Sequence, residues 1–258
     1  GYIIRPFGAI VFGHIGDCYG RKIALVGSVF LMGFATLFIG CMPDYQSIGI
    51  LAPIGLLMCR ILQGLAISGE YNGAGIFLIE NMHKDRPCFA GACISASACA
   101  GMVIGGLAAY FVSLPGSPVW AWRIPFMLGG LSCFISSYAR KHITETPEFL
   151  KAKAQQKTLP FIEVLKYYKI SCLNVAIIAA FMGIFVYIGN IYIVTFFKDV
   201  VGLPAHHATF FAIVGEMGAA LLIPIMGHIA DIHKNPAQHF KVGLLITIIG
   251  APLIFMLS

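Results

Sequence analysis

The same five-residue turn occurs twice in this chain. Gly13-His-Ile-Gly-Asp17 returns as Gly227-His-Ile-Ala-Asp231, and an apolar segment that could cross a bilayer precedes each copy. The repeat therefore predicts two similar halves that present the same tight turn to the same side of a membrane. The first copy continues into Gly20-Arg21-Lys22, whereas the second continues as Ile232-His-Lys234 and lacks the Gly-Arg pair.

The composition excludes an ordinary soluble domain. Of the 258 residues, 59% are hydrophobic and only 11% are charged, about half the charged fraction of soluble proteins. The net charge of +6 does not come from one basic patch, so we expect no nucleic-acid partner. The eight cysteines contain no CxxC pair and fall mostly in apolar stretches, so we predict no metal site, disulfide framework or cofactor.

Apolar segments of the length that a bilayer requires follow one another along the chain. A helix needs about 20 apolar residues to cross the hydrocarbon core. The candidate spans are Tyr2–Gly16, Ile23–Cys41, Ile48–Ile79, Phe89–Leu114, Trp122–Ala139, Ile170–Phe197, Ala208–His228 and Val242–Ser258. The chain opens and stops inside apolar segments, without an initiator Met or a signal peptide, so we expect both ends to be truncated.

The distribution of Lys and Arg predicts the orientation. If the turn at 17–22 is cytoplasmic, alternation places thirteen basic residues in inside loops and only Lys198 outside. The predicted cytoplasmic loops are 17–22, 80–88, 140–169 and 229–241. The long polar stretch 140–169 divides the chain into a first helical half, 1–139, and a second, 170–258. A short amphipathic helix on the inner leaflet and a plain solvated linker are both consistent with this stretch.

Four motifs, in order, carry a family resemblance. The turn Gly13-x3-Asp17-x2-Gly20-Arg21-Lys22 resembles the signature loop between the second and third helices of the major facilitator superfamily. Three further stretches resemble the metabolite:proton symporter branch, nearest to its proline/betaine carriers. They are Arg60-Ile-Leu-Gln63-Gly64 followed by Gly69-Glu70-Tyr71, Trp122-Arg123-Ile-Pro125-Phe126, and Glu145-Thr-Pro147-Glu-Phe149.

The resemblance covers the whole chain and implies a fold and a function. The expected fold is an all-α polytopic membrane bundle with about eight of the family's twelve helices, the first and last truncated. Helices 2–6 would lie in 1–139 and helices 7–9 in 170–258. The expected activity is proton-coupled symport of a small zwitterionic or carboxylate solute, such as proline or betaine, across the inner membrane. The partners would be that solute, protons and the lipid bilayer.

The turn itself has a physical interpretation. Gly20 allows a tight reversal, Asp17 lies where a helix start favours an anion, and the two cations after Gly20 face anionic headgroups. The resemblance implies that the Asp engages the start of a helix in the other half and holds one face of the carrier closed. The alternative is a topology anchor and turn cap. The lost Gly-Arg weakens the latch expectation for the second copy. The predicted gating residues are Gly13, Asp17, Gly20, Arg21, Lys22 and Asp231.

Charged residues inside predicted spans are candidates for function because a charge in lipid is costly unless it is paired or hydrated. Arg60 lies near mid-depth, where it could bind a substrate carboxylate, and Arg5 could line the cavity or sit at the outer surface. Glu70 and Glu216 are the candidate proton carriers, because low dielectric favours a protonated carboxyl group. The alternative for each is a structural pair. Arg60 and Glu70 are about 15 Å apart along one helix, so each needs another partner.

Aromatic and small residues suggest two further roles. Tyr187 and Asn190 belong to a polar-aromatic stretch that could contact a quaternary ammonium through cation–π attraction, although such aromatics usually serve packing. The pairs Gly69/Gly73 and Gly101/Gly105 have the spacing that lets helices approach closely. The chain carries Met102 where the antiporters of the superfamily have Pro, which favours symport.

Two other classes of function stay open. The chain could be an inactive remnant, or one part of a split carrier whose complementary fragment supplies the missing helices. A membrane-embedded enzyme is the third possibility. We expect no enzyme, because no obvious nucleophile–base pair, metal cluster or phosphate cradle is present.

Overall fold

The structure is a computed structural model that describes residues 2–81, 86–112, 114, 116–142, 144–145, 164, 166–234, 238–239 and 241–246. Within these residues all regular secondary structure is helical, which confirms the predicted all-α class. Most of the predicted linker 140–169 and of the last predicted span lies outside the described residues.

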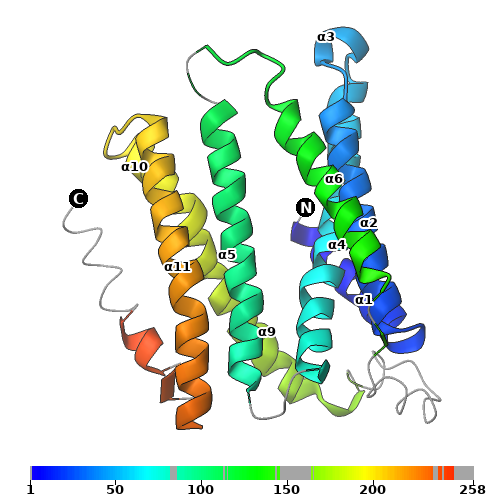
Figure 1. Ribbon diagram of the computed structural model, residues 1–258, viewed down its shortest axis with the longest axis vertical. Coiled ribbons are helices and arrows are strands. Elements are labelled where there is room, and N and C mark those ends of the chain that lie inside the picture. The colour runs from blue at the N-terminus through cyan, green and yellow to red at the C-terminus, as the bar shows by residue number, and fades with distance from the viewer. Residues whose placement is uncertain are drawn as a thin grey trace. The chain divides into compact units, whose positions relative to one another are not determined.

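The helices follow the predicted spans closely (Figure 1). In chain order they are η1 (Tyr2–Ile4), α1 (Arg5–Cys18), α2 (Arg21–Cys41), α3 (Tyr45–Ile48), α4 (Leu51–Asn81), α5 (Pro87–Val112), α6 (Arg123–Arg140), α9 (Lys169–Tyr187), η2 (Ile188–Tyr192), α10 (Ile193–Asp199) and α11 (Ala205–His233). One start differs from the prediction. Gly49 has φ 56° and separates α3 from α4, so the span predicted from Ile48 begins at Leu51.

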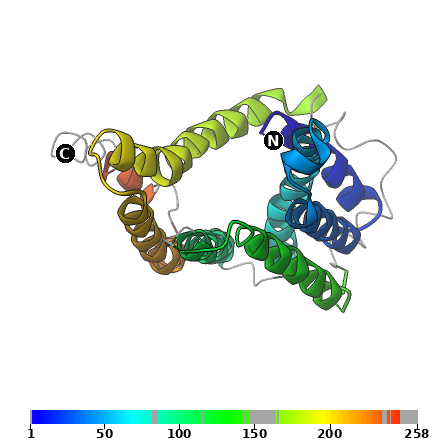
Figure 2. The same cartoon turned by 90° about the horizontal axis from the view of Figure 1, so that it is seen from above.

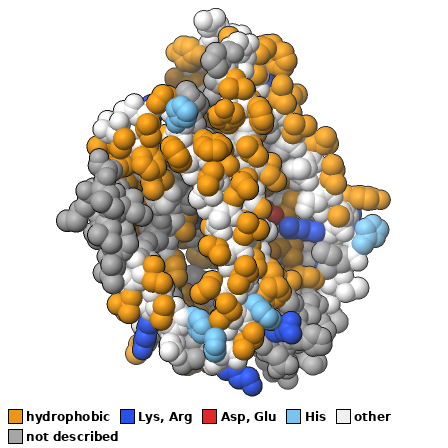
Figure 3. Space-filling model, turned by 60° about the vertical axis from the view of Figure 1, so that its left-hand side comes forward, with side chains coloured by type: hydrophobic (Ala, Val, Ile, Leu, Met, Phe, Trp, Pro, Cys, Tyr) orange, Lys and Arg blue, Asp and Glu red, His pale blue; other side chains and the backbone are white. Residues whose placement is uncertain are grey.

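Among the described residues, four helices are long and apolar enough to cross a membrane: Arg21–Cys41, Leu51–Glu80, Pro87–Val112 and His207–His233. In the last two, only 6% of the most apolar window is buried within the protein. Hydrophobic side chains cover most of the face shown in Figure 3. Water does not tolerate so much exposed apolar surface, so the surrounding medium of these helices is lipid.

The chain forms two compact units, each described here by itself. The first consists of Gly1–Asn81 with Phe111–Ile178, and the second of Met82–Tyr110 with Ala179–Ser258. These boundaries differ from the predicted halves 1–139 and 170–258, because α5 groups with the later helices. The division into two functional halves stays a prediction.

In the first unit α2 packs against both α4 and α6 (Figures 1 and 2). Small residues make these approaches possible. A Cβ on Gly33 would lie 2.8 Å from the Cβ of Cys133, and Gly130 leaves comparable room for Leu37. At the start of α6, the Arg123 guanidinium donates a hydrogen bond to Oδ1 of Asp44, which lies between α2 and α3, at 2.7 Å. Close contacts at Gly33 and Gly130 therefore join α2 to α6, and an ion pair joins the start of α6 to Asp44, which follows α2.

In the second unit α5 and α11 run antiparallel and side by side (Figures 1 and 2). Gly227 lies against Ala92, and Gly106 lies against Ile213 with its Cβ position 2.9 Å from Cγ1 of that residue. The prediction that glycines four residues apart let helices approach closely is right for α4, where Gly69 contacts Phe12 of α1, but wrong for α5. A Cβ at Gly101 or Gly105 would meet nothing within 4 Å. The glycine of α5 that contacts α11 is the adjacent Gly106, because Gly106 lies on the face of α5 that packs on Ile213.

Candidate functional site

The second copy of the repeated turn caps another helix. Asp231, near the end of α11, accepts hydrogen bonds from the backbone amides of Cys88 at 3.0 Å and Phe89 at 2.8 Å, in the first turn of α5. The first amides of a helix have no partner within the helix, and its dipole favours an anion there. The cap thus joins two helices more than 140 residues apart in sequence.

The cap lies at one end of a contact that continues along α5 and α11. Four residues before Asp231, Gly227 packs so closely on Ala92 and on the Cys88 carbonyl that a Cβ would overlap them. The positions 88 and 231, 92 and 227, and 106 and 213 pair in one antiparallel register. The Gly and the Asp of the repeat therefore act together: the Gly lets the backbones approach, and the Asp then reaches the helix start.

The first copy makes a different contact. Asp17, near the end of α1, forms an ion pair with Arg21 at the start of α2, and Arg21 Nε lies 3.6 Å from Glu80 Oε1 at the end of α4. The Lys22 amide donates to Glu145 Oε1 at 3.2 Å. Among the described residues, the first copy of the turn thus contacts the end of α4 and the segment after α6, both in the first unit. Its Asp17 pairs with Arg21, and the second copy has no Arg at the equivalent position.

In both copies the residue three positions after the Asp has a positive φ. Gly20 has φ 130°, and Lys234, three residues after the second Asp, is left-handed with φ 53°. Lys234 is the only residue other than glycine with a positive φ among the described residues. A left-handed conformation costs a non-glycine residue about 1 kcal/mol. The second copy therefore has a positive φ at this position at a conformational penalty, although its ψ of 21° differs from the 145° of Gly20 and the glycine is absent.

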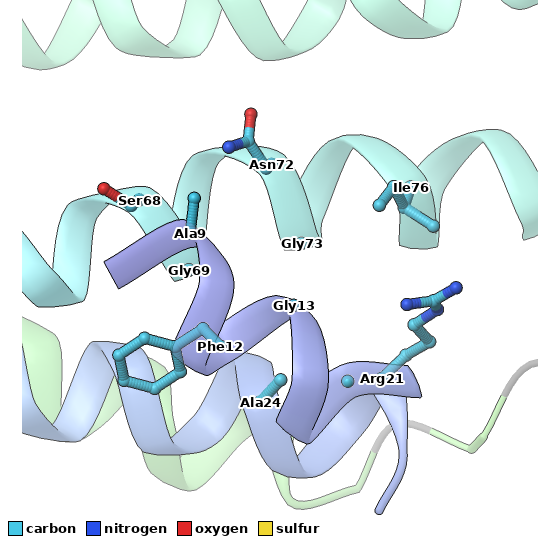
Figure 4. A pocket seen from close by; sticks show the side chains of 11 residues that line it. Ala9, Phe12, Gly13, Arg21, Ala24, Ser68, Gly69, Asn72, Gly73 and Ile76 are labelled. Atoms are coloured by element: carbon cyan, nitrogen blue, oxygen red, sulfur yellow. The ribbon is translucent and has the colours of Figure 1, made fainter. Parts of the chain in front are cut away.

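A small cavity lies beside the first turn. It measures about 50 Å³ and is enclosed by α1, the start of α2 and the middle of α4. Figure 4 shows Arg21 at one end and the polar side chains of Ser68 and Asn72 on α4. Phe12 of α1 fills the space above Gly69, where a Cβ would overlap its ring. The volume suits one or two waters rather than a substrate.

The predicted proton carrier Glu70 has a partner that sequence reasoning missed. Its Oε1 accepts from Arg140 Nη2 at 3.3 Å, across the interface between α4 and α6. The two side chains are 32% and 25% exposed, so the pair is partly shielded. Arg140 ends α6 and appeared in the sequence only as a loop cation, because spacing does not show which helix faces Glu70.

The predicted substrate ligand Arg60 lies on the exposed side of α4. Its Nη1 donates to Gln63 Oε1 at 3.2 Å, and Gln63 Nε2 donates to Thr36 Oγ1 of α2 at 2.9 Å. The guanidinium is thus oriented by a short polar chain that leaves most of its donors available. Within the described residues no acid forms an ion pair with Arg60, and the prediction that Arg60 does not pair with Glu70 agrees with this.

Glu216 faces α5. The Cys99 thiol lies against its carboxyl group, and Oε2 is buried without a hydrogen-bond partner. A buried carboxylate oxygen without a donor is costly. Glu216 therefore fits the predicted class of proton carriers, and its role stays a prediction.

The other predicted ligands lie apart from one another in sequence. Arg5 begins α1 and is exposed, and Tyr187 ends α9 at 37% exposure. Asn190 belongs to η2, a π-helical turn, and its side chain lies outside the described residues. π-Helical turns occur often at functional sites, which agrees with a role for this stretch. That these residues share a cavity with Arg60 stays a prediction.

Comparison with known proteins gives a family and several relatives. The family described as "Major Facilitator Superfamily" matches residues 2–258. The "Putative proline/betaine transporter" of Staphylococcus aureus (strain MSSA476) is 30% identical over 240 residues, which cover 89% of this chain and 51% of that protein. The "Inner membrane metabolite transport protein YhjE" of Escherichia coli (strain K12) is 32% identical over 241 residues, 89% of this chain and 54% of that protein.

A third relative matches more closely over a shorter stretch. The "Putative metabolite transport protein" of Haemophilus influenzae is 41% identical over 171 residues, 64% of this chain and 38% of that protein. The chain spans about half the length of the curated relatives it matches. No solved structure matches it significantly.

Proposed function

The chain belongs to the Major Facilitator Superfamily, and on that premise we propose that it forms the larger part of a proton-coupled symporter. The substrate would be a small zwitterionic or carboxylate solute of the proline/betaine kind, carried across the inner membrane. The names of the relatives from S. aureus and E. coli support the substrate class and the membrane. In this proposal the loops 17–22, 80–88, 140–169 and 229–241 are cytoplasmic.

The observation that carries the proposal is the Asp231 cap on α5. Alternating access needs a contact that holds one face closed and can be broken as the carrier changes state. A carboxylate on two amides of a helix start meets this need, because the bond is strong when made and water replaces it when the helices part. The first copy would serve the same purpose once Asp17 leaves Arg21.

The roles of the intramembrane charges follow from their contacts. Protonation of Glu70 would remove its charge and with it the ion pair to Arg140, which joins α4 and α6. Proton binding would thereby loosen one helix contact, and the free energy of that contact would couple the proton to the conformational change. Arg60, held by Gln63, would bind the solute carboxylate by a two-pronged hydrogen bond. Glu216 is the second candidate carrier.

The test is uptake of labelled proline and glycine betaine into membrane vesicles with an imposed pH gradient. We expect Glu70→Gln to abolish accumulation driven by the gradient while solute exchange continues. Arg60→Gln should raise the KM about tenfold or more, as expected for a lost charged hydrogen bond. Asp199→Asn, an exposed acid at the end of α10, is the matched control. Accumulation that is unchanged in both variants would overturn these assignments.

A second candidate function follows from the comparisons, since the chain spans about half the length of its relatives. The chain could act only with a complementary chain that supplies further helices, or it could be inactive. Co-expression with the remaining helices of a relative distinguishes the two. Restored uptake and co-purification support a split carrier, and absence of both supports an inactive remnant.

A further inference from the structure

A groove on the first unit lies between α2 and α6. Its volume is about 370 Å³, within the range of small-molecule sites. Its walls are mostly apolar and come from two helices that pack closely elsewhere along their length. The lining residues are Val26, Gly27, Phe30, Phe134, Ser137, Tyr138 and Lys141.

The groove opens toward lipid. On α2, the exposed positions Ile23, Gly27, Phe30, Phe34 and Phe38 recur every three or four residues and form one stripe. The opposite stripe is buried against α4 and α6 and contains Ala24, Ser28 and Ala35. A helix with this pattern turns the first stripe to its surroundings, which in a membrane protein are acyl chains.

The aromatic walls of the groove are ordered. The rings of Phe30 and Phe134 meet edge to face with centroids 5.1 Å apart. Gly27 lacks a side chain, and a Cβ there would come no nearer than 4.0 Å to any side chain outside its own neighbourhood. The groove therefore remains open at Gly27, beside the touching rings of Phe30 and Phe134, and these rings form one apolar wall of it.

One end of the groove is positively charged. Lys141, directly after α6, places its ammonium 5.9 Å from the centre of the Tyr138 ring. The Lys22 ammonium donates a hydrogen bond to the Lys141 carbonyl oxygen, so a second cation lies at the same end of the groove. Glu145 accepts from the Lys22 amide, but within the described residues no acid forms an ion pair with either lysine. An anion can therefore approach Lys141.

We propose that this groove binds one anionic phospholipid, with an acyl chain along the wall formed by Phe30 and Phe134 and the headgroup phosphate at Lys141. Apolar walls alone would accept any lipid. The cation at the end selects a headgroup of net negative charge, and a basic residue near the membrane surface contributes about 1 kcal/mol to such binding. This lipid-binding proposal requires that the protein lies in a membrane, but it does not rest on the proposed transport function.

Native mass spectrometry of the full chain in detergent tests the proposal, with phosphatidylglycerol and phosphatidylcholine of identical acyl chains as probes. We expect one phosphatidylglycerol to stay bound preferentially. Lys141→Gln should weaken its binding about fivefold and leave phosphatidylcholine unchanged. Lys166→Gln is the matched control, since Lys166 also lies over a tyrosine, Tyr167, at 5.4 Å but does not line the groove.

Two further arms identify the source of the anion and the place of the acyl chain. Gly27→Leu fills the groove and should displace both lipids, while circular dichroism confirms that the helices persist. Millimolar inorganic phosphate should not compete, because it lacks the chain. Equal binding of the two lipids, an unchanged affinity in Lys141→Gln, or displacement by free phosphate would each overturn the proposal.

Discussion

Asp231 near the end of α11 holds the first turn of α5 through the amide of Phe89, at 2.8 Å. The neighbouring Cys88 amide binds the same carboxylate. One side chain thus satisfies two amides that the helix cannot satisfy itself. The absence of the Gly-Arg pair made a helix-capping role less expected for this copy, yet Asp231 caps α5; its role as a latch stays a prediction.

Removal of the carboxylate should loosen the start of α5. Asp231→Ala deletes both acceptors, and a lost helix cap costs about 1–2 kcal/mol. Hydrogen exchange in the peptide that starts at Pro87 should then accelerate by roughly 5- to 30-fold. Asp231→Asn keeps one acceptor and should show a smaller effect. Equal exchange in the wild type and Asp231→Ala would contradict the cap.

Relief of the left-handed turn should stabilise the protein. Lys234 has φ 53°, which glycine adopts without strain. Lys234→Gly should therefore raise the free energy of unfolding by about 1 kcal/mol, less the greater entropy of glycine in the unfolded chain. Thermal unfolding in detergent measures this. Lys234→Ala, which keeps the strain, is the control, and a gain in that variant of the same size would point to the lost charge instead.

The cluster around Arg21 should behave as a coupled network. Arg21 contacts both Asp17 and Glu80, and Oε2 of Glu80 is buried without a partner. Arg21→Gln should destabilise the fold by about 1–3 kcal/mol, because it leaves Glu80 uncompensated. The double variant Arg21→Gln with Glu80→Gln should recover part of that loss. Strictly additive effects on the melting temperature would show that the two residues are not coupled.

Two glycines beside the same cavity should respond oppositely to alanine. A Cβ on Gly69 would overlap the Phe12 ring, whereas one on Gly13 would meet nothing within 4 Å. Gly69→Ala should destabilise by about 1–3 kcal/mol through overpacking. Gly13→Ala should be neutral or stabilise by up to about 1 kcal/mol, because alanine favours the helix. Unfolding curves of the two variants measure the contrast, and equal shifts would argue against close packing of α1 on α4.

The fold was largely predictable, and the reasons are physical. A bilayer fixes the length of a spanning helix, so α2, α4, α5 and α11 were predictable from apolar length alone. The start of α4 was not, because Gly49 ends a short helix by a local conformation. The grouping of α5 with α11 depends on contacts between distant segments, which hydropathy does not encode.

The candidate site was predictable in its residues but not in its partners. Asp231 stood out as the Asp of the repeated turn, and Glu70 stood out because an acid in an apolar segment is costly. The amides of Cys88 and Phe89 carry no sequence signal of their own, although Pro87 at the start of an apolar helix was a hint. Arg140 was assigned to a loop, and Lys234 is a residue that left-handed turns disfavour. Only the three-dimensional arrangement identifies these partners.

The most direct test of the account is labelling of Cys88 by a maleimide that does not cross membranes, in a chain whose other seven cysteines are replaced. The proposed topology places Cys88 at the cytoplasmic start of α5, under the Asp231 cap. It predicts slow labelling in inside-out vesicles, no labelling in right-side-out vesicles, and an acceleration of about tenfold in Asp231→Ala, which corresponds to a cap of about 1.4 kcal/mol. Labelling from the outer face, or a rate that Asp231→Ala leaves unchanged, would contradict it.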